Sequence, residues 1–142
     1  MLNRDEIKTF LPHREPMLIL DSVFLDKHGD ATGAYTVTGE EFFLSGHFPG
    51  FPVVPGVILC EIIAQSAGIL VMDELKKGEL PLFIGIENVR FRQMVKPGDT
   101  VKTKCKLLRS SGKLVKIKGV AKVNEQVCVD GIFLLMLRAK DD

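Results

Sequence analysis

Two stretches in the second half of the chain alternate between lysines and apolar or small side chains. In residues 100–109, Val101, Thr103 and Cys105 alternate with Lys102 and Lys104, and residues 114–123 repeat the pattern. A period of two places one set of side chains on the wet face of a β-sheet and the other set on its buried face. Together with other apolar runs bounded by turn residues, this pattern predicts strands at residues 17–25, 31–38, 80–91, 100–109, 114–123 and 127–139.

One segment has a different pattern and predicts a long helix. Residues 57–72 are apolar on every side of a helix. The sizeable polar exceptions are Glu61, Gln65 and Ser66. Pro55 suits the start of a helix, and lysines followed by Gly78 suit its end. Because a helix that is apolar all round must be enclosed, we predict an α+β fold in which a curved, mostly antiparallel sheet of five to six strands wraps one long central helix.

Length and composition suit one soluble domain, residues 1–142. The hydrophobic fraction of 46% and the charged fraction of 26% are ordinary for a globular protein. The longest apolar run, residues 53–72, is interrupted by polar and helix-breaking residues and falls short of the ~18 apolar residues of a membrane-spanning helix. Residues 1–6 lack the pattern of a signal peptide. We therefore expect a cytoplasmic protein with no membrane segment.

The cysteines give no sign of a disulfide or metal framework. Cys60, Cys105 and Cys128 are odd in number, widely spaced and without a Cys-x-x-Cys pair. This spacing predicts buried, reduced thiols. We expect no metal site.

Charge is distributed unevenly although the net charge is only +1. Residues 1–50 hold four basic and eight acidic side chains, whereas residues 90–122 hold eleven basic ones against Asp99 alone. The basic region is either the solvated face of a sheet or a docking surface for an acidic partner. A nucleic-acid partner is disfavoured, because the chain has no Trp, one Tyr and no stacking pattern among these lysines.

A histidine and a glutamate are the strongest candidates for chemistry. His47 lies in a loop stiffened by prolines and glycines, and Glu61, fourteen positions later, is the only ionisable acid in the apolar helix. An imidazole exchanges protons near neutral pH, and burial favours the protonated form of a carboxyl group. The pair could therefore act as base and acid on an organic substrate. A histidine that only hydrogen-bonds its loop, and a glutamate satisfied structurally, remain the alternatives.

Two further features support a site at the start of this helix. Gly56 and Val57 would present free N–H groups at the positive end of the helix dipole, where they could hold a carbonyl oxygen on which negative charge develops. Gln65, one turn after Glu61, could hydrogen-bond and orient its carboxyl group. A plain helix start carrying a water molecule is the alternative for the first feature.

Several motifs in one order resemble those of a known family. They are Leu11-Pro12-His13-Arg14-x-Pro16; His47-Phe48-Pro49-Gly50-x-Pro52-Val53-x-Pro55-Gly56-Val57 with Glu61 and Ala64-Gln65; Gly85-Ile86-x-x-Val89-Arg90-Phe91-Arg92; and Val95-x-Pro97-Gly98-Asp99. This set, which covers nearly the whole chain, resembles the FabZ-type 3-hydroxyacyl-(acyl-carrier-protein) dehydratases. The resemblance implies the hot-dog fold and a homodimer, often assembled to a hexamer as a trimer of dimers, with active sites at the dimer interface.

The resemblance also implies roles for the candidate residues. His47 would remove a proton from C2 of a (3R)-3-hydroxyacyl thioester in type II fatty acid biosynthesis, and Glu61 of the neighbouring subunit would protonate the departing hydroxyl, giving the trans-2-enoyl product and water. The Gly56 N–H would polarise the thioester carbonyl. The substrate would be carried on the phosphopantetheine arm of acyl carrier protein, so that no other cofactor is needed. Arg90, Arg92 and Lys96 are candidates for docking this acidic carrier.

Departures from the family pattern leave alternatives open. Leu82 and Phe83 stand where relatives often carry a tyrosine that gates the acyl tunnel. The sister group that also isomerises the double bond typically has Asp in place of Glu61, which favours plain dehydration, although a bifunctional dehydratase/isomerase remains an alternative. A thioesterase or a non-catalytic acyl-binding module on the same fold are the others. His13 and Arg14 are expected to anchor the N-terminal turn.

Overall fold

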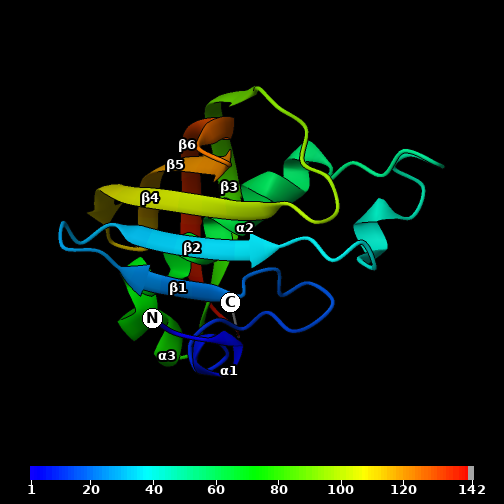
Figure 1. Cartoon of the computed structure of the whole chain (residues 1–142). Coiled ribbons are helices and arrows are strands. Elements are labelled where there is room, and N and C mark those ends of the chain that lie inside the picture. Colours follow the sequence, from blue (N-terminus) through cyan, green and yellow to red (C-terminus); the bar gives the residue numbers. More distant parts are fainter. Residues whose placement is uncertain (141–142) are drawn as a thin grey trace.

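A single antiparallel sheet forms the body of the molecule, for which the computed structural model describes residues 1–140. The sheet order is β1-β2-β4-β5-β6-β3, so that β1 and β3 form its two edges (Figure 1). The strands are β1 (Ser22–Leu25), β2 (Ala31–Thr36), β3 (Glu79–Phe91), β4 (Thr100–Ser111), β5 (Leu114–Val123) and β6 (Gln126–Ala139). The remaining elements are α1 (Arg4–Ile7), η1 (Phe42–Leu44), α2 (Gly56–Ala67), η2 (Gly68–Val71) and α3 (Met72–Lys76).

The predicted central helix is present, and the sheet wraps it. Helix α2 packs on β2, β4, β5 and β6, and the helical run continues through η2 into α3 (Figure 1). The approach is close at Gly119 of β5, where an added Cβ would clash with Ile63 Cγ2. Ile62, Ile63 and Phe133 are fully buried. Most of α2 meets other structure, which explains most of its apolar sequence, whereas Val57 in its first turn is 70% exposed.

The expectation that the longest apolar run is too short to span a membrane is corrected by the helical run from α2 to α3. By length and composition alone, the 21 residues Gly56–Lys76 could cross a membrane, and the mean hydropathy of their 18-residue window is 1.7. In this structure 56% of the most apolar window is buried inside the molecule. The run is this long and apolar because it forms the core helix that the sheet encloses.

The first strand is shorter than predicted. Residues 17–21 precede β1, yet Leu18, Ile19 and Leu20 are buried, which accounts for the apolar pattern that predicted a strand there. Part of this segment binds a side chain: Gln65 Oε1 accepts from the Ile19 N–H at 2.9 Å, and Gln65 Nε2 donates to Met17 O at 2.7 Å. A buried side-chain amide thus replaces strand pairing here.

Candidate functional site

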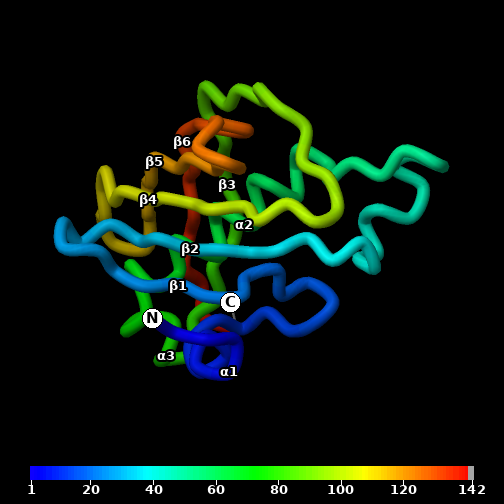
Figure 2. Tube along the Cα trace, viewed as in Figure 1, coloured from blue at the N-terminus to red at the C-terminus, as the bar shows by residue number. Residues whose placement is uncertain are grey.

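The loop between η1 and α2 holds His47 by both its backbone and its ring. The Val53 N–H donates to His47 O at 2.8 Å, and the His47 N–H donates to Leu44 O at 3.1 Å. Phe48 stacks on the imidazole with ring centroids 4.2 Å apart. Figure 2 shows this loop extending away from the sheet. The histidine is therefore fixed by local contacts on a segment that extends beyond the sheet.

The hydrogen bond at the ring determines which nitrogen of His47 can accept a proton. His47 Nδ1 lies 2.8 Å from Val53 O. A carbonyl oxygen can only accept, so Nδ1 carries the hydrogen and the lone pair of the neutral ring lies on Nε2. Nε2 is then the atom available as a base.

A largely apolar hollow of about 640 Å³ lies beside His47. Its exposed apolar side chains include Phe48, Phe51, Val57, Phe91 and Met94, each between 49% and 70% exposed. Gly56, at the start of α2, also lines it. An exposed apolar concentration of this kind marks a surface that binds a ligand or another protein.

The start of α2 offers the predicted N–H groups to this hollow. Pro55 precedes the first helical residue, and the helix bonds begin with the N–H groups of Ile58 and Leu59, which donate to Pro55 O. Among residues 1–140, neither Gly56 nor Val57 donates its N–H in a hydrogen bond. These two groups point from the positive end of a 12-residue helix. Together they could hold a carbonyl oxygen that gains negative charge.

Glu61 lies in a separate, smaller hollow of about 30 Å³ lined by His13, Gln65 and Phe83. The structure contains the hydrogen bond expected from the spacing, because Gln65 Nε2 donates to Glu61 Oε2 at 2.8 Å. A second partner was not expected: His13 Nε2 lies 3.2 Å from the same oxygen. Arg14 does anchor the N-terminal turn, donating to Leu11 O and His13 O, but the His13 ring turns toward Glu61.

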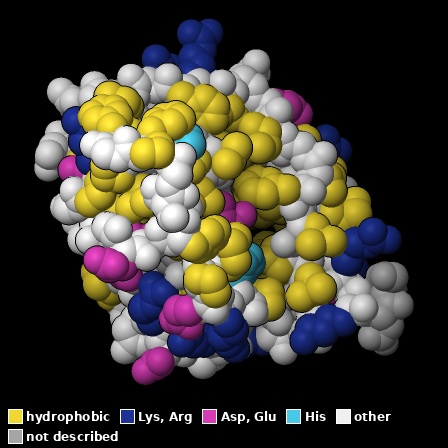
Figure 3. All heavy atoms as spheres, turned by 90° about the vertical axis from the view of Figure 1, so that its right-hand side faces the viewer, with side chains coloured by type: hydrophobic (Ala, Val, Ile, Leu, Met, Phe, Trp, Pro, Cys, Tyr) yellow, Lys and Arg dark blue, Asp and Glu magenta, His cyan; other side chains and the backbone are white. Residues whose placement is uncertain are grey.

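Within one chain, His47 and Glu61 are not brought into one hollow. His47 joins Gly56 and Val57 in the larger hollow, whereas Glu61 joins Gln65 and His13 in the smaller one. Figure 3 shows the face toward which the loop extends, where hydrophobic side chains gather around histidine and acidic side chains. A site that used both groups would need a further surface laid against this face.

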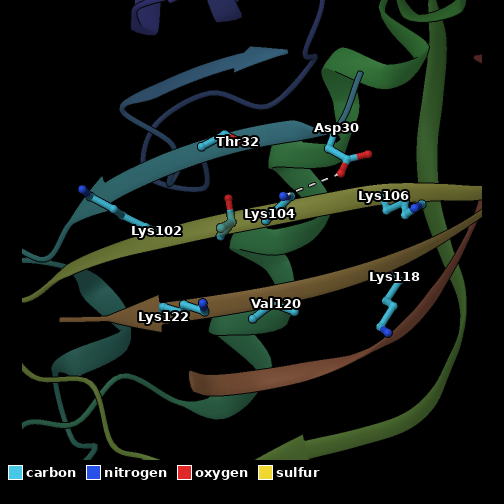
Figure 4. Close-up of a pocket in the computed structure, with 9 residues that line it drawn as sticks. Asp30, Thr32, Lys102, Lys104, Lys106, Lys118, Val120 and Lys122 are labelled. Carbon is cyan, nitrogen blue, oxygen red and sulfur yellow. Dashed lines mark ion pairs between the residues drawn. The ribbon is translucent and has the colours of Figure 1, made fainter. Parts of the chain in front are cut away.

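Eight of the eleven basic residues in the 90–122 region fall on two surfaces. Arg92 lines the His47 hollow and pairs with Asp130 at 2.7 Å, while Lys96 Nζ lies 5.4 Å from the centre of the Phe51 ring. Arg90 is exposed nearby in β3. The second surface is the outer lysine face of β4 and β5, a hollow of about 460 Å³ (Figure 4). Its lysines are Lys102, Lys104, Lys106, Lys118 and Lys122.

The three cysteines are buried and free, as predicted. Burial raises the pKa of Cys60 to about 11 and that of Cys105 to about 12. Both thiols stay protonated at neutral pH, and Cys105 Sγ donates to Ile63 O at 3.2 Å.

Comparison with known proteins gives the family. A family model for the FabA-like domain matches residues 11–131. The 3-hydroxyacyl-(acyl-carrier-protein) dehydratase FabZ of Bacillus licheniformis is 40% identical over 144 residues, covering 100% of both chains. That of Geobacillus thermodenitrificans is 42% identical over 131 residues, covering 90% of each.

A solved structure gives the fold. The dehydratase heterocomplex ApeI:P from Xenorhabdus doucetiae matches with a TM-score of 0.81 at 22% identity, covering 95% of this chain and 92% of that one. This likeness confirms the hot-dog fold predicted from the sequence. The chain belongs to the FabA-like family and, within it, to the FabZ-type 3-hydroxyacyl-(acyl-carrier-protein) dehydratases.

Proposed function

We propose that this protein is a hydro-lyase that dehydrates (3R)-3-hydroxyacyl groups on acyl carrier protein to trans-2-enoyl groups in type II fatty acid biosynthesis. Relatives that cover 90% to 100% of the chain are named 3-hydroxyacyl-(acyl-carrier-protein) dehydratases, which supports the proposal. The observation that carries the proposal is the hydrogen bond between His47 Nδ1 and Val53 O, because it leaves a basic Nε2 beside an apolar hollow.

The proposed reaction assigns one task to each group. His47 Nε2 takes the proton from C2, and the electron pair of that C–H bond forms the C2–C3 double bond while the C3–O bond breaks. Glu61 donates a proton to the departing oxygen, which leaves as water. The N–H groups of Gly56 and Val57 hold the thioester oxygen as negative charge develops on it. Return of the proton from His47 to Glu61 through water resets the site.

A second copy of the chain would complete this site. Strand β3 is a 13-residue edge strand, and no other strand among residues 1–140 pairs with its outer side. It exposes Leu82, Ile84 and Ile86 by 43% to 51%. A long apolar edge invites pairing with another chain. We propose a homodimer formed through β3 in which His47 of one subunit meets Glu61 of the other, assembled further as a trimer of dimers.

The carrier, the cofactor and the compartment follow from the same proposal. Acyl carrier protein would dock near the His47 hollow, where Arg90, Arg92 and Lys96 lie on the edge of β3 and the following loop. The acyl group arrives on the phosphopantetheine arm of the carrier, so the reaction calls for no cofactor of the enzyme itself. We place the protein in the cytoplasm, where this carrier would be present.

Product analysis after incubation with 3-hydroxyacyl carriers of several chain lengths tests the function. We expect trans-2-enoyl product, no shifted double bond and no free thiol. His47→Ala and Glu61→Gln should each lower turnover by at least about a hundredfold. Free thiol without enoyl product would identify a thioesterase, and carrier binding without turnover an acyl-binding module.

Subunit mixing tests the composite site. The two inactive variants, each homogeneous, are exchanged and then assayed. Partial return of activity is expected, since mixed dimers contain one site with both intact residues. Absence of recovery after exchange has been verified by mass spectrometry would reject the shared site.

A further inference from the structure

His13 contacts the proposed acid but has no part in the reaction as proposed. Its Nε2 lies 3.2 Å from Glu61 Oε2, and the two side chains are only 22% and 19% exposed. Both line the small hollow with Gln65 and Phe83. The contact is therefore mostly shielded from water.

The backbone around His13 is held independently of this contact. The Arg14 guanidinium donates to Leu11 O at 2.9 Å, to His13 O at 2.7 Å and to Lys8 O at 3.2 Å. Three carbonyl groups of the N-terminal turn are thus tied to one planar donor. The His13 ring is presented to Glu61 by a turn that does not depend on the ring for its own structure.

The surroundings of the ring select its protonation form. His13 Nδ1 is buried and has no hydrogen-bond partner among residues 1–140. An N–H at that position would be a buried donor without an acceptor, which is costly, whereas a lone pair there is tolerated more easily. Of the two neutral tautomers, the favoured one carries its hydrogen on Nε2, the nitrogen that lies 3.2 Å from Glu61 Oε2.

Two nitrogens lie close to Glu61 Oε2. Gln65 Nε2 donates to it at 2.8 Å, and His13 Nε2 lies 3.2 Å from it. Glu61 Oε1 makes no hydrogen bond within residues 1–140. A protonated Glu61 is therefore expected to carry its hydrogen on Oε1, away from the two nitrogens.

We propose that His13 is a positioning residue that, with Gln65, keeps Glu61 Oε2 as an acceptor and so places the transferable proton on Oε1. The inference rests on the proposed dehydration, in which Glu61 is the acid. Without the His13 donor, Oε2 could take the proton, and the carboxyl group could turn its reactive oxygen away from substrate. The loss would fall on turnover rather than on substrate binding.

The test uses two substitutions of His13 with a matched control at His28, an exposed histidine in the turn between β1 and β2. His13→Leu removes the donor and should lower kcat by roughly tenfold to a hundredfold, since misplacing a reacting group by about 1 Å can cost ~10²-fold. KM should stay within about twofold. His13→Gln restores an N–H donor and should recover most of the loss, whereas His28→Gln should match the wild type. Wild-type kcat in His13→Leu, or equal losses in both His13 variants, would overturn the proposal.

Nuclear magnetic resonance of the imidazole nitrogens gives a readout that needs neither a His13 substitution nor turnover. We expect His13 to be protonated on Nε2, with a signal that shifts in Glu61→Gln. Protonation on Nδ1 would overturn the proposal. A wild-type protein that forms no enoyl product would reject the dehydratase function, while this measurement would still decide whether His13 donates to Glu61.

Discussion

The Phe91 ring lies against the α-carbon of Gly56 at the start of α2. A Cβ on Gly56 would meet Phe91 Cε1 at 2.5 Å and Cδ1 at 2.7 Å. Phe91 is 57% exposed, so its ring is a movable wall of the His47 hollow rather than part of the core. Because Gly56 has no Cβ, the Phe91 ring can pack beside the Gly56 N–H, which makes no hydrogen bond of its own within residues 1–140.

Gly56→Ala should impair catalysis more than folding. The added methyl group forces either the Phe91 ring or the first turn of α2 to move, and turnover should fall by roughly tenfold or more, because displacement of a carbonyl-binding group by ~1 Å is costly. Unfolding temperature should change little, because the ring can turn into solvent. Kinetics of Gly56→Ala, Phe91→Ala and the double variant provide the check. Losses that simply add would show that the two residues are not coupled.

The ring of His47 should carry its hydrogen on Nδ1, opposite to His13. The cause is Val53 O, an obligate acceptor 2.8 Å from Nδ1. Nitrogen chemical shifts of the neutral protein measure this directly, with exposed His28 as an internal reference for an unconstrained ring. If Nε2 of His47 carried the hydrogen, it would have no lone pair to accept the proton from C2. This result would contradict the role of His47 as the base.

Periodicity predicted the core of this structure well and its irregular contacts poorly. The lysine alternation placed β4 and β5, and the all-apolar run placed the helical segment from α2 to α3, because burial on one face or on all sides imposes a repeat. The same reasoning gave a wrong prediction for the segment before β1. Its residues are buried and apolar, but its backbone hydrogen-bonds to the side chain of Gln65 instead of to a strand.

The periodic pattern of the sequence could not predict contacts between residues that are distant along the chain. His13 and Glu61 are held together by a turn and a helix that only the folded sheet brings close. The family motif containing His13 was visible in the sequence, but its neighbours suggested a turn anchor, a description that fits Arg14. Whether His47 and Glu61 meet across subunits likewise depends on an assembly that no pattern along one chain encodes.

Gln65 should contribute to stability as well as to orientation of Glu61. Its amide satisfies the Ile19 N–H and Met17 O, and the residue is 1% exposed. Gln65→Leu would strand both backbone groups and should lower the free energy of unfolding by about 2–4 kcal/mol. Urea denaturation measures the change. A loss below ~1 kcal/mol would mean that water enters and replaces the amide.

Charge reversal should show which of the two basic surfaces docks the acyl carrier protein. Lys96→Glu, beside Phe51 at the His47 hollow, should raise KM for carrier-bound substrate about two- to fivefold, as expected for an exposed pair worth up to ~1 kcal/mol. Its effect should shrink in high salt and vanish with a small thioester substrate.

The matched control for this charge reversal is Lys106→Glu on the outer lysine face. Lys106 stands directly opposite Lys118 in the β4–β5 register, so the change replaces a like-charge pair with an opposite one. KM should be unaffected, and stability should rise by a few tenths of a kcal/mol. A larger KM increase in Lys106→Glu than in Lys96→Glu would move the docking surface to the outer face of the sheet.

Glu41, which lies just before the His47 loop, should make the stability of the protein fall at acidic pH. Its carboxylate accepts from Tyr35 Oη at 2.6 Å and from the Thr38 and Gly39 N–H groups at 2.8 Å. Burial opposes ionisation, but these hydrogen bonds outweigh it and lower the pKa of Glu41 from 4.5 to about 2. A pKa lowered by folding adds stability above pH 4.5, and this stability is lost as the pH falls toward 2.

Glu41→Gln should therefore unfold about 3–6 °C below the wild type at pH 7, from roughly 1 kcal/mol of lost charge-assisted hydrogen bonding. The gap should close as the pH is lowered from about 4.5 toward 2, because the wild-type carboxylate then takes up a proton and becomes as neutral as the amide. Calorimetry across this range measures it, with the exposed neighbour Glu40→Gln as the control. A gap that stays constant down to the lowest pH would show that shape, not charge, makes Glu41 stabilising.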